Sequence, residues 1–119
     1  MEERYSRHYS LEEVGEIGQQ KIGGAKVLVI GAGGLGCPVL QYLTSAGVGT
    51  IGVADGDFVS LTNLQRQILF DTTDIGELKV KSAVAKLQRL NPEVTFNQIP
   101  KLISSINAVE IVSRYDVIV

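Results

Sequence analysis

The chain has 119 residues, of which 45% are apolar and 20% are charged, and its formal net charge is −2. This length and composition are typical of one globular domain, and the charge offers no basic field for nucleic acid or anionic lipid. No apolar run approaches the roughly 18 residues that span a bilayer, and the charged start MEERYSRHYS is not a secretory signal, so we expect a cytoplasmic protein with no membrane or nucleic-acid partner.

The first half of the chain predicts a helix, a strand, a second helix and a second strand. Ser10-Leu11-Glu12-Glu13 fits a capping box, in which the serine oxygen and the glutamate satisfy free backbone donors at a helix start. Residues 26–30 then form a predicted strand. Their continuous apolar run, 27–30, indicates that the strand is covered on both faces, because an exposed face would make the pattern alternate. Apolar residues at helical spacing follow at 35–43, and residues 50–55 form the second predicted strand.

The second half continues the alternation of strands and helices. The predicted elements are a short helix around 63–67, a helix at 80–90, a strand at 94–99, a short helix at 107–114 and a buried strand at 116–119. This order predicts an α/β fold, a Rossmann-like parallel sheet with helices on both faces and strand order 3-2-1-4. Because a domain seldom stops in its core, we expect residues 1–119 to be the N-terminal part of a longer domain, truncated after about four strands.

A glycine-rich turn joins the first predicted strand to the next helix. Gly31, Gly33 and Gly36 fit the pattern G-x-G-x-x-G, and Gly34 adds a fourth glycine. Without side chains the backbone can approach a phosphate, and the helix start offers free N–H groups and a positive dipole end. Asp55 follows the second strand and can accept hydrogen bonds from ribose hydroxyls. The alternative is a tight turn with no ligand, and the motif alone does not choose between NAD and a triphosphate.

Polar side chains just past the second strand favour the triphosphate. Asn63, Gln65, Arg66 and Gln67 offer amide and guanidinium donors that a plain dinucleotide fold does not need. Lys79 can bring a second cation to the same crevice. Two cations beside a glycine loop suit a triphosphate, because negative charge develops on the phosphates during nucleotidyl transfer. Ordinary surface charge is the alternative for an isolated arginine or lysine.

The chain resembles the adenylating enzymes related to ubiquitin-activating enzyme, and in particular the bacterial MoeB, ThiF and HesA group. The resemblance runs from Arg4 to the last residue and rests on RYSRH, GAGGLGCPVLQYLTSAGVG, DGDFVSLTNLQRQ, DIGELKVKSA and LNPEV. It implies ATP-dependent adenylation of the C-terminal glycine carboxylate of a ubiquitin-like sulfur carrier that ends in Gly-Gly. Pyrophosphate is released, as in molybdopterin or thiamine biosynthesis.

The resemblance also implies roles for particular residues. Arg66 and Lys79 would act on the phosphates, and Arg7 would reach the phosphates of the other subunit in a homodimer, so these three form the expected catalytic set. Gly34 would lie against the nucleotide, and Asp55 would hold the ribose. The expected ATP-binding residues are Gly31, Gly33, Gly34, Gly36, Asp55, Thr62, Asn63, Arg66 and Lys79.

The expected cofactors are ATP and Mg²⁺, and the family's magnesium-binding aspartate is expected beyond residue 119. Zinc is not expected, because the chain has one cysteine, Cys37, which we expect to pack under the glycine loop. Two alternatives stay open from the residues alone. One is an NAD-binding oxidoreductase domain, and the other is a non-catalytic module that binds a nucleotide or a partner. The isolated segment is expected to be a weak nucleotide binder at best.

Overall fold

A computed structural model describes residues 3–119 of the chain. Its centre is a four-stranded parallel sheet in the order β3-β2-β1-β4, which confirms the predicted topology. The strands are β1 (Lys26–Ile30), β2 (Thr50–Ala54), β3 (Thr95–Ile99) and β4 (Val117–Ile118). In such sheets ligands bind beyond the carboxyl ends of the strands, near the point where the strand order reverses. That point lies beside β1.

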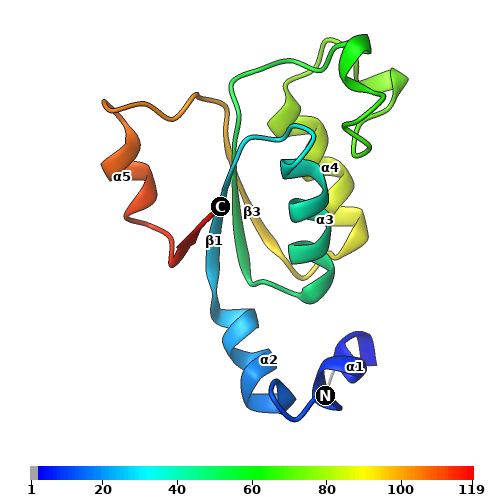
Figure 1. Cartoon of the computed structure of the whole chain (residues 1–119), viewed down its shortest axis with the longest axis vertical. Helices are drawn as coiled ribbons and strands as arrows, with labels where there is room; N and C mark the ends of the chain where they lie inside the picture. Colours follow the sequence, from blue (N-terminus) through cyan, green and yellow to red (C-terminus); the bar gives the residue numbers. More distant parts are fainter. Residues whose placement is uncertain (1–2) are drawn as a thin grey trace.

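Helices cover both faces of the sheet, as predicted (Figure 1). The helices are α1 (Ser6–Tyr9), α2 (Gly15–Gly24), α3 (Gly36–Ala46), α4 (Lys79–Leu90) and α5 (Ala108–Val112). α3 and α4 pack on one face, and α5 lies on the other. Within the described residues, no helix has the length and apolar character needed to cross a membrane.

The strand β1 contributes to two hydrophobic cores. Val27 and Val29 enter the larger core with α3 and α4, whereas Leu28 packs on the other face with Ala54 and Ile111. Successive side chains of a strand point to opposite faces, so a strand that is covered on both sides needs an unbroken apolar run. The apolar residues 27–29 are therefore buried on both faces of the sheet, as predicted, whereas the two ends of the strand are exposed.

The end of α4 is tied to α3 and to the N-terminal segment by Asn91. The buried Asn91 Nδ2 donates to Thr44 O at 2.9 Å and to Tyr5 Oη at 2.8 Å. Tyr5 in turn lies where any side chain at Gly47 would stand, since a Cβ there would be 2.5 Å from the Tyr5 ring. The N-terminal segment is thus docked at the end of the domain opposite the β1–α3 turn (Figure 1).

The prediction of a capping box at Ser10 is wrong. Ser10 ends α1, and its Oγ donates to Ser6 O at 3.1 Å. The helix α2 begins only at Gly15, after a turn in which the Gly15 N–H donates to Leu11 O at 2.8 Å. The hydroxyl is therefore used by the preceding helical turn.

The prediction that residues 116–119 form a buried strand is wrong in its burial. β4 pairs with β1 in parallel, but Val117, Ile118 and Val119 are 50%, 39% and 52% exposed. Among the described strands β4 is outermost, and it has only β1 as a neighbour. Its apolar side chains consequently lie at the rim of the described fold.

Candidate functional site

The β1–α3 turn is shaped by two of its glycines. Gly31 has φ +98°, a conformation that L side chains rarely adopt, and its N–H donates to Ala54 O at 2.7 Å. A Cβ on Gly36 would stand 2.0 Å from Gly31 O, so the start of α3 crosses the end of β1 only without a side chain there. The fold itself therefore requires glycine at both positions.

The other two glycines of the turn would accept a small side chain without a clash. A Cβ on Gly33 would be 3.7 Å from Gln67 Nε2, and a Cβ on Gly34 would be 3.6 Å from Arg66 Cδ, which are ordinary contacts. The N–H groups of residues 33–36 donate to no backbone acceptor in the part of the chain that the structure describes. Free N–H groups at a helix start form a cradle for an anion. The arrangement therefore fits a phosphate on the bare surface of Gly33 and Gly34.

The carboxylate of Asp55 anchors this turn from the end of β2. Its Oδ2 accepts the Ala32 N–H at 2.8 Å, and its Oδ1 accepts the Asp57 N–H at 2.7 Å. Each carboxylate oxygen can accept more than one hydrogen bond, so this anchoring leaves acceptor capacity for the expected contact with a ribose hydroxyl.

The segment after β2 closes a 3-10 turn at Leu61–Asn63, and the helix predicted around 63–67 is replaced by turns. The Asn63 side-chain oxygen accepts from Ser60 N at 3.3 Å and from Ser60 Oγ at 2.9 Å. The Thr62 hydroxyl lies 3.2 Å from Ser60 Oγ. Thr62 and Asn63, which were expected to line the phosphate side, thus make hydrogen-bonding contacts within the local turn.

Arg66 reaches the glycine loop from this turn. Its Nη1 donates to Thr62 O at 3.3 Å, and its Cγ and Cδ lie beside Gly34. The guanidinium is therefore carried by a stem that lies along the loop where a phosphate would sit.

Lys79 begins α4 and is buried, with 6% of its surface exposed. Its N–H donates to Asp57 O at 3.0 Å, which places it beside the turn that Asp55 anchors. Among residues 3–119 its ammonium has no carboxylate within ion-pair distance. A buried lysine without an anionic partner is unusual, because removing the charge from water is unfavourable. This cation is therefore available to an anionic ligand.

Cys37 packs under the loop, as expected. It is fully buried, and its Sγ donates to Ala32 O at 3.4 Å. Burial raises the pKa of the Cys37 thiol, against a smaller lowering by the Leu69 N–H and by the Lys79 charge. The cysteine is thus a core residue of the turn.

Arg7 is not brought to this site within one chain. It lies in α1, at the opposite end of the domain from the β1–α3 turn (Figure 1). Its neighbours in RYSRH are used to dock the segment: Arg4 donates to Leu90 O at 3.1 Å, and His8 Nδ1 lies 2.6 Å from Gln19 Oε1. Arg7 is exposed, with no hydrogen bond or ion pair to residues 3–119.

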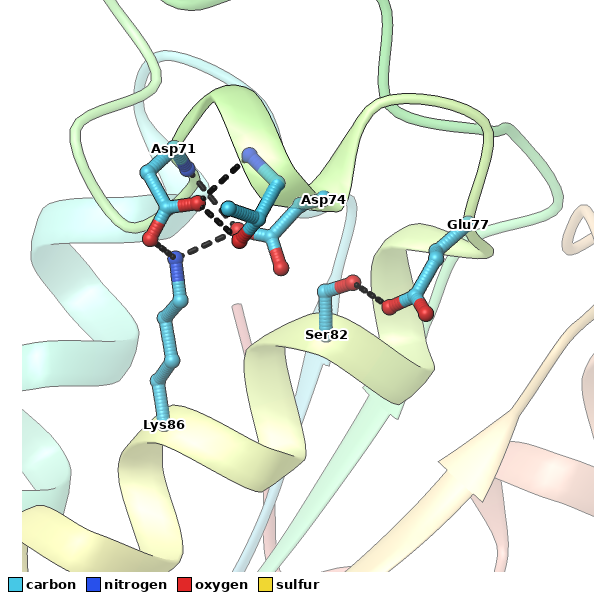
Figure 2. A network of polar contacts seen from close by, with 6 residues as sticks. Asp71, Asp74, Glu77, Ser82 and Lys86 are labelled. Atoms are coloured by element: carbon cyan, nitrogen blue, oxygen red, sulfur yellow. Dashed lines mark hydrogen bonds and ion pairs between the residues drawn. The ribbon is translucent and has the colours of Figure 1, made fainter.

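Sequence reasoning missed a charged network that fastens the segment 71–77 onto α4. Figure 2 shows Lys86 reaching Asp71 and Asp74, and the Ser82 hydroxyl donating to Glu77 at 2.9 Å. Hydrogen bonds from Thr73 and Lys86 lower the pKa of Asp71 to about 2. The pKa of Lys86 is raised, because its bonds to Asp74 and Asp71 outweigh the lowering by burial. An Asp-x-x-Asp spacing with a lysine on the next helix is the only sequence signal for it.

From the sequence, Gln67 was named only as one of four polar side chains past the second strand and was given no individual role. Gln67 was one of several polar residues in a segment, and nothing in the sequence marked it as buried, yet only 4% of its surface is exposed. The nearest signal is that it precedes the buried pair Leu69 and Phe70.

Comparison with known proteins gives the same family that the motifs suggested. Residues 5–119 match the model of the ThiF family. The chain is 49% identical over 117 residues to the sulfur carrier protein adenylyltransferase of Thermus thermophilus, covering 98% of this chain and 43% of that protein. It is 50% identical over 116 residues to the adenylyltransferase and sulfurtransferase UBA4 of Kluyveromyces lactis, covering 97% of this chain and 26% of that protein.

Solved structures share the fold. The crystal structure of E. coli MccB with ATP superposes with a TM-score of 0.86 and 32% identity, over 99% of this chain and 37% of that one. The E. coli tRNA N6-threonylcarbamoyladenosine dehydratase TcdA superposes with a TM-score of 0.90 and 27% identity, over 97% of this chain and 48% of that one. The chain thus spans less than half the length of each of these relatives. Because the family model covers nearly all of it, the chain belongs to the ThiF family.

Proposed function

We propose that residues 1–119 are the nucleotide-binding part of an adenylyltransferase. The whole enzyme would use ATP to adenylate the C-terminal glycine carboxylate of a ubiquitin-like sulfur carrier, of the molybdopterin or thiamine type, and would release pyrophosphate. The observations that support the proposal are the Arg66 stem beside Gly34 and the buried Lys79, which has no carboxylate partner within residues 3–119. The names of the relatives in Thermus and Kluyveromyces support the same reaction.

The nucleotide in this proposal is ATP and not NAD. Glycine loops and a carboxylate at Asp55 suit both compounds, but the buried charge of Lys79 and the guanidinium of Arg66 suit a triphosphate better. The MccB structure that resembles this chain was solved with ATP. An ATP-consuming reaction also accords with a cytoplasmic location.

The proposed chemistry needs positioning and charge more than proton transfer. The carrier carboxylate is ionised at pH 7, so it can attack the α-phosphate without a general base. Arg66 and Lys79 would stabilise the charge that develops on the phosphates and on the departing pyrophosphate. Arg7 lies too far from the candidate site of its own subunit to act there. In a homodimer it would instead add a third cation to the site of the other subunit.

Mg²⁺ would enter with the nucleotide in this scheme. Residues 3–119 contain no group of three or more His, Cys, Asp or Glu side chains placed to bind a metal. Oxygen ligands from phosphates commonly complete a magnesium site that the protein supplies with one or two carboxylates. The proposal places the contributing aspartate outside these residues.

ATP–pyrophosphate exchange in the protein that contains this segment tests the proposal. Exchange should require a carrier that ends in Gly-Gly, and it should be lost when the terminal glycine is deleted. NAD should not compete with ATP. Exchange without any carrier, or competition by NAD at equal concentration, would contradict the assignment. Parallel assays with a molybdopterin-type and a thiamine-type carrier would identify the pathway.

A further inference from the structure

The carboxamide of Gln67 has unused hydrogen-bonding capacity at the glycine loop. Its Oε1 is enclosed and has no partner in the part of the chain that the structure describes. Its Nε2, which is not enclosed in this way, lies 3.7 Å from the position of a Cβ on Gly33. Buried polar side chains are nearly always hydrogen-bonded, and Nε2 is the one group of this carboxamide that a ligand can still reach. Since Nε2 is a donor, the ligand that fits it is an acceptor.

The backbone holds Gln67 firmly in this place. Its N–H donates to Asn63 O at 2.9 Å, and its carbonyl accepts the Phe70 N–H at 3.1 Å. The preceding side chain, Arg66, lies on Gly34. Two consecutive side chains therefore cover two consecutive glycines, with the guanidinium stem over one and the carboxamide over the other.

The chemistry of the carboxamide decides what it can bind there. Phosphate oxygens only accept hydrogen bonds, whereas the Nε2 group of glutamine donates two. An anion above Gly33 would select the observed orientation, because the reverse one would place Oε1 against negative charge. A neutral donor at this point also complements the charged donors Arg66 and Lys79.

We propose that Gln67 is a further phosphate-binding residue of the site, with its Nε2 donating to a phosphate oxygen held above Gly33. The inference rests on the proposed ATP site and names a contact within it. In the ligand-free protein the carboxamide makes no hydrogen bond within residues 3–119, so its removal should leave the fold intact and affect binding alone.

The test compares Mg-ATP and adenosine binding by calorimetry in the protein that contains the segment. Gln67→Met keeps the length of the side chain and removes the donor, and Gln65→Met, at an exposed glutamine of the same turn, is the matched control. A hydrogen bond to a charged group corresponds to a loss of roughly ten- to a hundredfold in ATP affinity. Adenosine affinity should change less than about twofold, since adenosine has no phosphate, and the unfolding midpoint should not fall.

The outcomes separate this inference from the proposed function. Equal ATP affinity in Gln67→Met and wild type, or a parallel loss of ATP and adenosine affinity, would overturn the role of Gln67 and leave ATP binding standing. Failure of the wild-type protein that contains the segment to bind ATP would overturn both. Should Gln67→Met unfold, Gln67→Leu serves instead, because leucine has a similar volume, has no donor and adds no charge to the buried site, so it should weaken ATP binding to a similar extent.

Discussion

Asp55 and Ala32 are joined by a hydrogen bond of 2.8 Å from the Ala32 N–H to the Asp55 carboxylate, and this bond fastens the glycine loop to the end of the neighbouring strand. The second oxygen of Asp55 accepts the Asp57 N–H, so the same carboxylate also orients the segment that leads to Arg66 and Lys79. One buried side chain thereby places the two halves of the candidate site relative to each other.

Asp55→Asn should therefore weaken the fold as well as the site. The amide has one acceptor oxygen for two N–H donors, and its NH₂ group would face the other N–H. We expect a loss of about 2 kcal/mol in the free energy of unfolding, measured by urea denaturation. Asp57→Asn, at an exposed carboxylate, is the control and should stay within about 0.5 kcal/mol of wild type. Equal stability of the two variants would show that the anchoring bonds contribute little.

Two glycines of one turn should respond differently to alanine. Gly36→Ala places a Cβ 2.0 Å from Gly31 O, so the turn must deform and the unfolding midpoint should fall sharply. Gly34→Ala meets only an ordinary contact with Arg66, so it should fold normally but lose ATP affinity, since its methyl group fills the proposed phosphate surface. Thermal unfolding and ATP titration of both variants check this. Normal ATP binding by Gly34→Ala would place the phosphates elsewhere.

Lys79→Met should separate binding from stability. Methionine keeps most of the buried stem, and removing an unpaired buried ammonium should leave the unfolding free energy unchanged or raised. ATP affinity should fall by at least about tenfold, because a charge-assisted contact to phosphate is lost. Lys81→Met, at an exposed lysine on the same helix, should change neither quantity. Destabilisation by Lys79→Met with normal ATP affinity would indicate a structural lysine.

Arg7 should act on the neighbouring subunit, and complementation measures this in the protein that contains the segment. Arg7→Ala and Lys79→Met should each be inactive alone. A randomly mixed dimer of the two contains one intact site in every heterodimer, so activity should recover to about one quarter of wild type. No recovery after subunit exchange would exclude action in trans. Arg4→Ala should instead lower stability, because Arg4 bonds to the end of α4.

Acid should weaken the attachment of segment 71–77 to α4. Asp71 has a pKa of about 2 in the folded protein, below its ordinary value of 3.8, so its stabilising contribution is present above about pH 4 and is lost as the pH falls towards 2. The difference in unfolding free energy between wild type and Asp71→Asn should shrink across that interval. High salt should shrink it as well, because Asp71 is exposed. A difference that is constant from pH 6 to pH 2 would contradict the assignment.

Local patterns in the sequence determine the architecture. Three patterns depend only on neighbours within a few residues, so they can be read from the sequence: the apolar run at 27–30, the glycine spacing from Gly31 to Gly36 and the apolar stripe on 80–90. The strand order and the α/β class followed from these elements. Ser10 is an exception, because a capping pattern is local but the preceding helical turn competes for the same hydroxyl.

Only the tertiary structure decided which polar groups have partners. Lys79 and Lys81 look alike in the sequence, but α4 packs against the sheet and buries the first while it exposes the second. Gln65 and Gln67 differ in the same way, since the turn at 61–67 directs one to solvent and the other onto Gly33. Burial and hydrogen-bond satisfaction depend on segments far apart in the chain, so no sequence window contains them.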